Sequence, residues 1–187
     1  MITSYPLPPI TADVGDYTSK GRLKVSNPEV IFFNTFQYGI ETDVWDTSTA
    51  NGGSATFDST ISAVDMAVTG TLNSEVIRQT LNVQRYSPGR SSELVFAVRL
   101  ETPAAGIRRR LGLFDGADGV YFEDNGGDYA CVIINSDGAT PTTTRIARAN
   151  WNGDKLDGTG ESGIIADATK QQIICIDYEW YLSLIHI

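Results

Sequence analysis

Residues 107–135 read IRRRLGLFDGADGVYFEDNGGDYACVIIN, and this stretch decides the fold class. It contains three short apolar or alternating runs, at Ile107–Phe114, Val120–Glu123 and Tyr129–Asn135. The dipeptides Asp118-Gly119 and Asn125-Gly126 separate these runs, and such dipeptides accept the positive φ of tight turns. Short runs set apart by turn residues are typical of β-strands.

The same pattern extends to both sides of this stretch. Further strands are predicted at Val30–Phe36, Ala63–Val68, Val76–Leu81, Leu94–Leu100, Thr143–Arg148 and Ile173–Trp180. Further turns are predicted at Asn51-Gly52-Gly53, Pro88-Gly89 and Asp137-Gly138. No window of a dozen residues shows a sustained 3.6-residue apolar period, so helices are not expected. The sequence therefore predicts an all-β fold, a two-layer antiparallel β-sandwich of jelly-roll (concanavalin A-like) type.

Alternation within two of these runs assigns side chains to faces, because successive residues of a strand point to opposite sides of the sheet. The core is predicted to contain Leu94, Phe96, Val98 and Leu100 from one run, and Ile174, Ile176, Tyr178 and Trp180 from the other. The opposite face of the second run carries Cys175, Asp177 and Glu179.

The chain of 187 residues is long enough for one domain, which should bury roughly 70% of the surface of the unfolded chain. Residues 1–28 contain four prolines and are predicted to form an extended N-terminal arm, either disordered or docked on a neighbouring subunit. Residues 29–182 are predicted to form the β-sandwich. Residues 183–187, Ser-Leu-Ile-His-Ile, resemble translated sequencing-adapter DNA, so we expect a non-native tail on a truncated chain that lacks a C-terminal strand.

Composition argues against several classes of function. The formal net charge of −9 disfavours sequence-independent binding to nucleic acid, which depends on cations that neutralise phosphates. Nine of the ten arginines lie between Arg78 and Arg148. They are expected on the solvated faces of several strands, and a local basic face is the alternative. The N-terminus has no signal-peptide pattern and no apolar run approaches the length of a membrane span, so a soluble protein without membrane insertion is expected. Cys131 and Cys175 lie in apolar runs and are interpreted as two buried thiols, with a single disulfide between them as the alternative.

Histidine-dependent catalysis is not expected, because His186 in the suspect tail is the only histidine. The remaining enzyme hypothesis places Asp177 and Glu179 on one sheet face, as a pair of glycosidase carboxylates would be placed. A glycosidase of jelly-roll type resembles Glu-x-Asp-x-Glu, and the first position here is Cys175. The alternative is a structural face on which these acids pair with an arginine, taken from Arg78, Arg99 and Arg109.

Two loops carry carboxylates that could bind a cation or a sugar. Asp115–Gly119 has the carboxylates of a calcium loop but lacks further ligands, so a hairpin turn is the preferred interpretation. No catalytic residue, metal site or cofactor is predicted. The loop from Trp151 to Gly163 combines an aromatic side chain with polar groups suited to a sugar or a cation. Its candidate ligand-binding residues are Trp151, Asn152, Asp154 and Asp157, with Asp177 and Glu179 on the sheet as further candidates. The competing interpretation is an ordered loop that Trp151 anchors to the sandwich.

Several blocks of sequence between about residues 21 and 180 occur in a recognisable order. They are Gly21–Pro28, Arg78–Thr80, Tyr86–Ser91, Leu111–Asp115, Gly119–Glu123, Trp151–Gly158, Ser162-Gly163 and Ile176–Trp180. Together they resemble uncharacterised structural proteins of marine bacteriophages and large aquatic viruses. In that group the last block is followed by a glycine- and valine-rich stretch and another strand, where this chain has Tyr181-Leu182 and the suspect tail.

The resemblance implies a non-enzymatic virion structural module of jelly-roll or lectin-like character, such as a capsid-associated, fibre or tail protein. Its partners would be other virion proteins or further copies of itself, and it would reach the virion by assembly in the host cytoplasm. A carbohydrate-binding adhesin that recognises a surface glycan is the second hypothesis, and a glycoside hydrolase-like jelly roll is the third. The resemblance carries over no catalytic residue.

Overall fold

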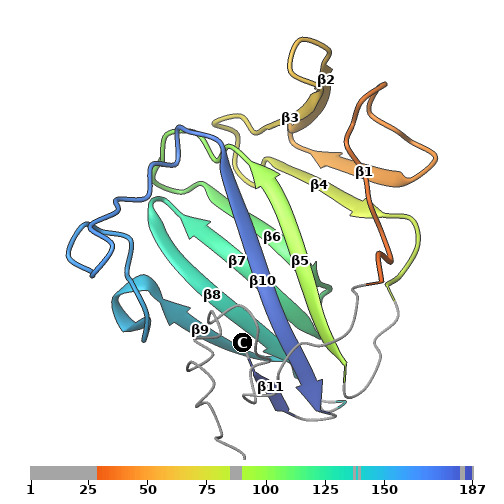
Figure 1. Cartoon of the computed structure of the whole chain (residues 1–187). Helices are drawn as coiled ribbons and strands as arrows, with labels where there is room; N and C mark the ends of the chain where they lie inside the picture. The colour runs from red at the N-terminus through yellow and green to blue at the C-terminus, as the bar shows by residue number, and fades with distance from the viewer. Residues whose placement is uncertain (1–28, 85–89, 137, 139, 182–183, 187) are drawn as a thin grey trace, which may run out of the picture. The chain divides into compact units, whose positions relative to one another are not determined.

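The computed structural model describes residues 29–84, 90–136, 138, 140–181 and 184–186. Their contacts group into two compact units, one of residues 29–84 and one of the described residues from 90 onward. Figure 1 shows that strands dominate both units, with one short 3-10 helix at Arg148–Asn150. The strands are β1 (Trp45–Ala50), β2 (Ser54–Asp58), β3 (Ala63–Ala67), β4 (Glu75–Thr80), β5 (Ser91–Val98), β6 (Arg108–Phe114), β7 (Gly119–Asn125), β8 (Asp128–Asn135), β9 (Thr142–Ala147), β10 (Gln172–Tyr181) and β11 (Leu184–His186). The predicted all-β fold class is confirmed.

The larger unit is a sandwich of two antiparallel sheets. One sheet has the order β6-β7-β8-β9, and the other has the order β11-β10-β5 (Figure 1). Val120 of β7 is 2% exposed and packs with Ile176 and Tyr178 of β10, which shows that the sheets face each other. The four-stranded sheet is a meander in which sequential strands are neighbours, and the jelly-roll connectivity stays a prediction.

Two hairpins build the centre of the meander. Gly126-Gly127 connects β7 to β8, and both glycines have positive φ values, of 62° and 94°. Asp115–Asp118 connects β6 to β7, because the Asp115 carboxylate accepts hydrogen bonds from the amides of Ala117 and Asp118. The interpretation of this segment as a hairpin turn is therefore confirmed.

A long segment completes the core beside the two-sheet contact. Trp151, Ala166 and Ala168 lie between β9 and β10 in the chain, and they pack with Leu100 and Tyr129. This segment therefore adds apolar contacts to the core next to those that β5 and β10 make. The predicted core positions Leu94, Phe96, Val98 and Leu100 all face this interior, as do Ile174, Ile176 and Tyr178.

The predicted strands agree with the structure except near the start of the described chain. Residues 30–36 form no strand, because Asn34 accepts a hydrogen bond from the amide of Phe36 and bends the backbone. Phe36 then takes a φ of 50°, which is outside the strand region. The strands β1 and β2 were not predicted, since their residues are mainly Thr, Ser and Ala rather than an apolar alternation.

The smaller unit consists of two separate two-stranded sheets, β1-β4 and β2-β3. Its aromatic contacts gather at Trp45, whose ring lies 5.5 Å from the rings of both Phe32 and Phe36. The Arg78 guanidinium lies 5.3 Å from the rings of Phe36 and Trp45. None of the residues described in this unit is buried.

The two ends of the chain can be placed only in part. The predicted N-terminal arm, residues 1–28, lies outside the described residues. At the other end the backbone of Leu184–His186, within the predicted non-native tail, pairs with Glu179–Tyr181. Among the described residues, no helix has the length and apolar character needed to cross a membrane.

Candidate functional site

Trp151, the aromatic residue of the candidate sugar-binding loop, is integrated into the sandwich. Its ring packs in the cluster that contains Leu100 and Tyr129. Its indole N–H donates a hydrogen bond of 3.2 Å to the carbonyl of Ile146 on β9. These contacts match the interpretation of Trp151 as an anchor, and they use the indole donor that a sugar ligand would need.

The two aspartates of the same loop organise its backbone. Asp154 accepts hydrogen bonds from the amides of Leu156 and Ser162, both at 2.8 Å. The hydroxyl of Ser162 and these amides hold the pKa of Asp154 below its ordinary value. Asp157 accepts from the hydroxyl and the amide of Thr159, which lowers its pKa as well. Asn152, the fourth candidate in this loop, is exposed.

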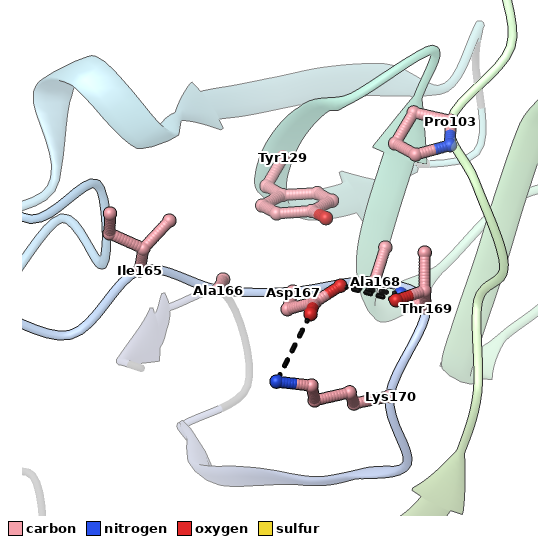
Figure 2. A pocket seen from close by; sticks show the side chains of 8 residues that line it. All are labelled: Pro103, Tyr129, Ile165, Ala166, Asp167, Ala168, Thr169 and Lys170. Atoms are coloured by element: carbon pink, nitrogen blue, oxygen red, sulfur yellow. Dashed lines mark hydrogen bonds and ion pairs between the residues drawn. The ribbon is translucent and has the colours of Figure 1, made fainter.

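A pocket of about 510 Å³ lies beside this loop (Figure 2). Figure 2 shows Tyr129 and Pro103 on one side and the segment Ile165–Lys170 on the other. The backbone ties pocket to loop, since the amide of Ala166 donates to the carbonyl of Leu156 at 2.8 Å. The pocket is open to solvent, and the predicted loop residues flank it without lining it.

The polar groups of the pocket come from its outer side. Asp167 accepts hydrogen bonds from the hydroxyl and the amide of Thr169, at 2.6 and 3.0 Å, and lies 3.4 Å from the Lys170 ammonium. The Thr169 contacts, followed by Lys170, lower the pKa of Asp167. Tyr129 keeps only 6% of its surface exposed, and burial followed by the charge of Asp124 raises its pKa. Sequence reasoning did not identify this pocket, because Tyr129 and Asp167 lie 38 positions apart in segments with no shared motif.

Asp177 and Glu179 share the outward face of β10, as the alternation predicts. The Asp177 carboxylate accepts a hydrogen bond of 2.7 Å from the hydroxyl of Ser91 on the neighbouring strand. Glu179 is only 3% exposed. The register places Asp177 opposite Glu93. None of the three proposed arginine partners is used in this way, because Arg109 pairs with Asp124, Arg99 pairs with Glu101, and Arg78 bonds to Thr47 and Ile40.

Two arginines neutralise acids that are buried in the meander. Arg109 meets Asp124, which is fully buried, at 2.6 Å. On the opposite face of the sheet Arg145 meets Glu123, which is 4% exposed, at 2.7 Å. This hydrogen bond raises the pKa of Arg145. These arginines therefore stabilise the sheet, whereas the sequence had placed them on solvated faces.

The cysteines occupy different environments, which corrects the interpretation of two buried thiols. Neither is part of a disulfide, and Cys131 is half-buried, so burial raises the pKa of its thiol. Cys175 is exposed because it points away from the sandwich interior on β10. Within the part of the chain that the structure describes, no three side chains of metal-ligating type come together.

The feature that sequence reasoning missed most completely is the apolar surface of residues 29–84. Large apolar side chains are exposed throughout this unit: Val30, Ile31, Phe32, Phe33, Tyr38, Ile61, Met66, Val68, Leu72, Ile77, Leu81 and Val83. A signal was present at Val30–Phe33, a continuous apolar run within the segment that was predicted as a strand. In comparisons with known proteins, no family model, no curated protein and no solved structure matches the chain.

Proposed function

We propose that this chain is a non-enzymatic structural module of a virus particle, which assembles with copies of itself or with other virion proteins. The observation that carries the proposal is the apolar surface of residues 29–84. Twelve large apolar side chains of this unit are exposed, and exposed apolar side chains in such number favour an interaction surface. An isolated two-stranded sheet is also marginally stable in water, and this unit has two of them. Association supplies the burial that the unit lacks.

The virion as the place of assembly rests on the sequence blocks that resemble phage and aquatic-virus structural proteins. The larger unit suits this role, because a sandwich with hydrogen-bonded hairpins and neutralised buried acids gives a firm frame for contacts. The hairpins and the buried ion pairs form within one chain and need no ligand.

Sedimentation velocity of the full chain across a range of concentrations tests the assembly step. We expect association that grows with concentration and weakens when Val30, Phe33 and Leu72 are each changed to Ser. Matched Ser changes at exposed sites with smaller side chains, Ala104 and Ala149, are the control. A chain that stays monomeric at every concentration contradicts the proposal. Mass spectrometry of purified particles from the parent virus tests the location, and particles without the protein contradict it.

A second candidate function is carbohydrate binding, which the pocket at Tyr129 and Asp167 favours. Thr169, Lys170 and Asp167 offer donors and an acceptor on one side of a space large enough for a sugar ring. Asn152 and Asp157 would extend such a site along the adjoining loop. A glycan array tests it, with Asp167→Ala and Asn152→Ala as variants. An array without hits, or hits that both variants retain, removes this candidate.

A further inference from the structure

Val30–Phe33 is a short segment that has the composition of a strand but belongs to no sheet. Its residues are Val, Ile, Phe and Phe, the β-branched and aromatic types that strands favour. The segment forms no strand, and its backbone makes no hydrogen bond among the described residues. All four side chains are exposed, Ile31 to 69% and Phe33 to 77%. The segment therefore has backbone groups that are available for pairing and apolar side chains that are open to solvent.

The β2–β3 hairpin has a sheet edge without a partner. β3 pairs with β2 on one side, and no described strand pairs with it on the other. Its last three residues, Asp65–Ala67, are exposed. Proteins commonly protect such an edge with a lysine, a proline or a bulge. β3 contains neither lysine nor proline, and its register with β2 runs without a bulge. The edge is therefore open to a further strand.

The side chains of this hairpin divide into an apolar face and a polar face. Phe57 of β2 lies opposite Val64 of β3, and Met66 shares the face of Val64 because it is two residues further along the strand. Met66 is 49% exposed at the open edge. A strand added beside β3 would extend this face with every second residue. Ile31 and Phe33 have that spacing.

We propose that Val30–Phe33 of one copy adds to the free edge of β3 in a second copy, as the third strand of that sheet. This inference rests on the proposed function, because it names a contact through which copies of the module associate. In this mode of recognition main-chain hydrogen bonds give affinity and alternate side chains give specificity. A two-stranded sheet is marginally stable in water, and a third strand stabilises it. The contact joins two different surfaces, so it can close into a ring or continue from copy to copy.

A second copy is the partner that the residues favour. Within its own chain the segment does not pair with β3, and Phe32 instead lies 5.5 Å from the ring of Trp45. In a strand Phe32 points away from the face of Ile31 and Phe33, so it can keep this contact while they pack on another copy. The segment also carries no charge, so it can approach Asp65 without the repulsion that other acidic surfaces of a chain of net charge −9 would meet.

Photo-crosslinking in the full chain tests which surface the segment contacts. Phe33 is replaced by the photoreactive residue p-benzoylphenylalanine, and copies labelled with heavy nitrogen are mixed with unlabelled copies. We expect cross-links from this position to β3 that join a heavy copy to a light one, mapped by mass spectrometry. The same replacement at Tyr38, an 86% exposed aromatic residue of the same unit, is the matched control and should not reach β3. Cross-links that miss β3, or that form only within one copy, contradict the proposal.

A charge at the edge tests the contribution of β3 to affinity. We expect Met66→Lys to raise the dissociation constant of self-association by roughly tenfold or more, because an added strand would bury the ammonium group without a partner. Gln79→Lys adds the same charge at an exposed position of β4 and should leave the dissociation constant unchanged. Far-UV circular dichroism checks that both variants fold. Equal weakening by the two variants would show an effect of net charge and would contradict the edge contact.

Hydrogen exchange distinguishes an added strand from side-chain contact alone. The amides of Ile31 to Phe33 should become protected as the protein concentration rises, and Met66→Lys should reduce this protection. If the chain associates while these amides stay unprotected and Met66→Lys has no effect on affinity, the strand addition is wrong and the assembly function stands. If the chain is monomeric at every concentration, both fail.

Discussion

Two neighbouring residues of β7, Glu123 and Asp124, place carboxylates on opposite faces of the meander. Each is almost wholly removed from water, and each meets an arginine, Arg145 or Arg109. Transfer of an unpaired carboxylate into such a site costs several kcal/mol. The ion pairs with the arginines therefore allow β7 to be buried with its two carboxylates. The pairs thus explain why charged residues interrupt the most buried strand of the fold.

Asp124→Ala is expected to lower the free energy of unfolding by about 3 kcal/mol, because it removes the ion pair with Arg109 and the acceptor for the Gly127 amide. Urea denaturation followed by circular dichroism measures the change. Asp128→Ala is the control, since Asp128 pairs with Arg145 while 59% exposed and should cost about 1 kcal/mol or less. Equal losses in the two variants would contradict this account of buried charge.

The loop at Asp154 should respond to acid. The folded pKa of Asp154 lies below its ordinary value of 3.8, so ionised Asp154 stabilises the loop above that pH and stops doing so as the pH falls below it. Amide NMR shifts of Leu156 and Ser162 should therefore change with a midpoint below 3.8. In Asp154→Asn this transition should vanish at both amides, while the Thr159 amide, bonded to Asp157, keeps its own. A midpoint above 3.8 would show that the carboxylate is not held by these bonds.

At the scale of elements, the meander β6–β9 was predictable because each hairpin carries its own chemistry in the sequence. Asn125-Gly126 and Asp118-Gly119 mark turns, and the runs between them alternate. The strand β1 was missed, because its pairing with β4 depends on residues 25 to 35 positions away rather than on its own composition. Where a strand has a weak pattern of its own, its register depends on the residues of its partner strand, which the strand's own sequence does not specify.

The glycines of β6 and its turn allow a matched test of strand approach. A β-carbon at Gly112 would overlap the backbone of Val120 and Tyr121 on the neighbouring strand, so Gly112→Ala should cost about 1–3 kcal/mol. Gly116 lies four residues later in the turn with nothing within 4 Å, and Gly116→Ala should be near neutral. Thermal unfolding of both variants measures the difference. Similar melting temperatures would mean that β6 shifts without cost.

The candidate loop was located from sequence, but its residues have two kinds of role that sequence could not separate. Trp151 and Asp154 form hydrogen bonds within the chain, whereas Asn152 is exposed. A tryptophan that stacks on a sugar and a tryptophan that anchors a loop can have the same neighbours in sequence. In the structure, the hydrogen bond from the Trp151 indole to the Ile146 carbonyl shows the anchoring role. The pocket behind the loop depends on Tyr129, which a distant hairpin supplies.

Substitution of Trp151 separates its packing from its hydrogen bond. Trp151→Phe keeps most of the ring contacts and loses the bond to Ile146, so a loss of about 1 kcal/mol is expected. Trp151→Ala also removes the packing against Leu100 and Tyr129, and about 3 kcal/mol is expected. Chemical denaturation gives both values. If the two variants lost equal stability, the ring would contribute no packing and the anchor role would be wrong.

At the scale of the whole molecule, burial is distributed unequally between the two units. Among the residues whose side chains are described, every buried one lies in the larger unit. The smaller unit has an aromatic cluster but no buried core, and the indole N–H of Trp45 within it lacks an acceptor among the described residues. Folding must offset the loss of chain entropy in both units, and only the larger one contains the burial to do so alone.

Hydrogen exchange should reveal this difference directly. In dilute protein the amides of β1–β4 should exchange at least on the order of a hundredfold faster than those of β7 and β8, because local opening costs little where few apolar contacts are lost. Raising the protein concentration should slow exchange in β1–β4 selectively, since association covers the apolar surface of residues 29–84 and leaves the sandwich core unchanged. The Val30→Ser, Phe33→Ser and Leu72→Ser variants should lose this concentration dependence. Strong protection of β1–β4 in the dilute monomer would mean that this unit is stable without a partner, and the main argument for assembly would then fail.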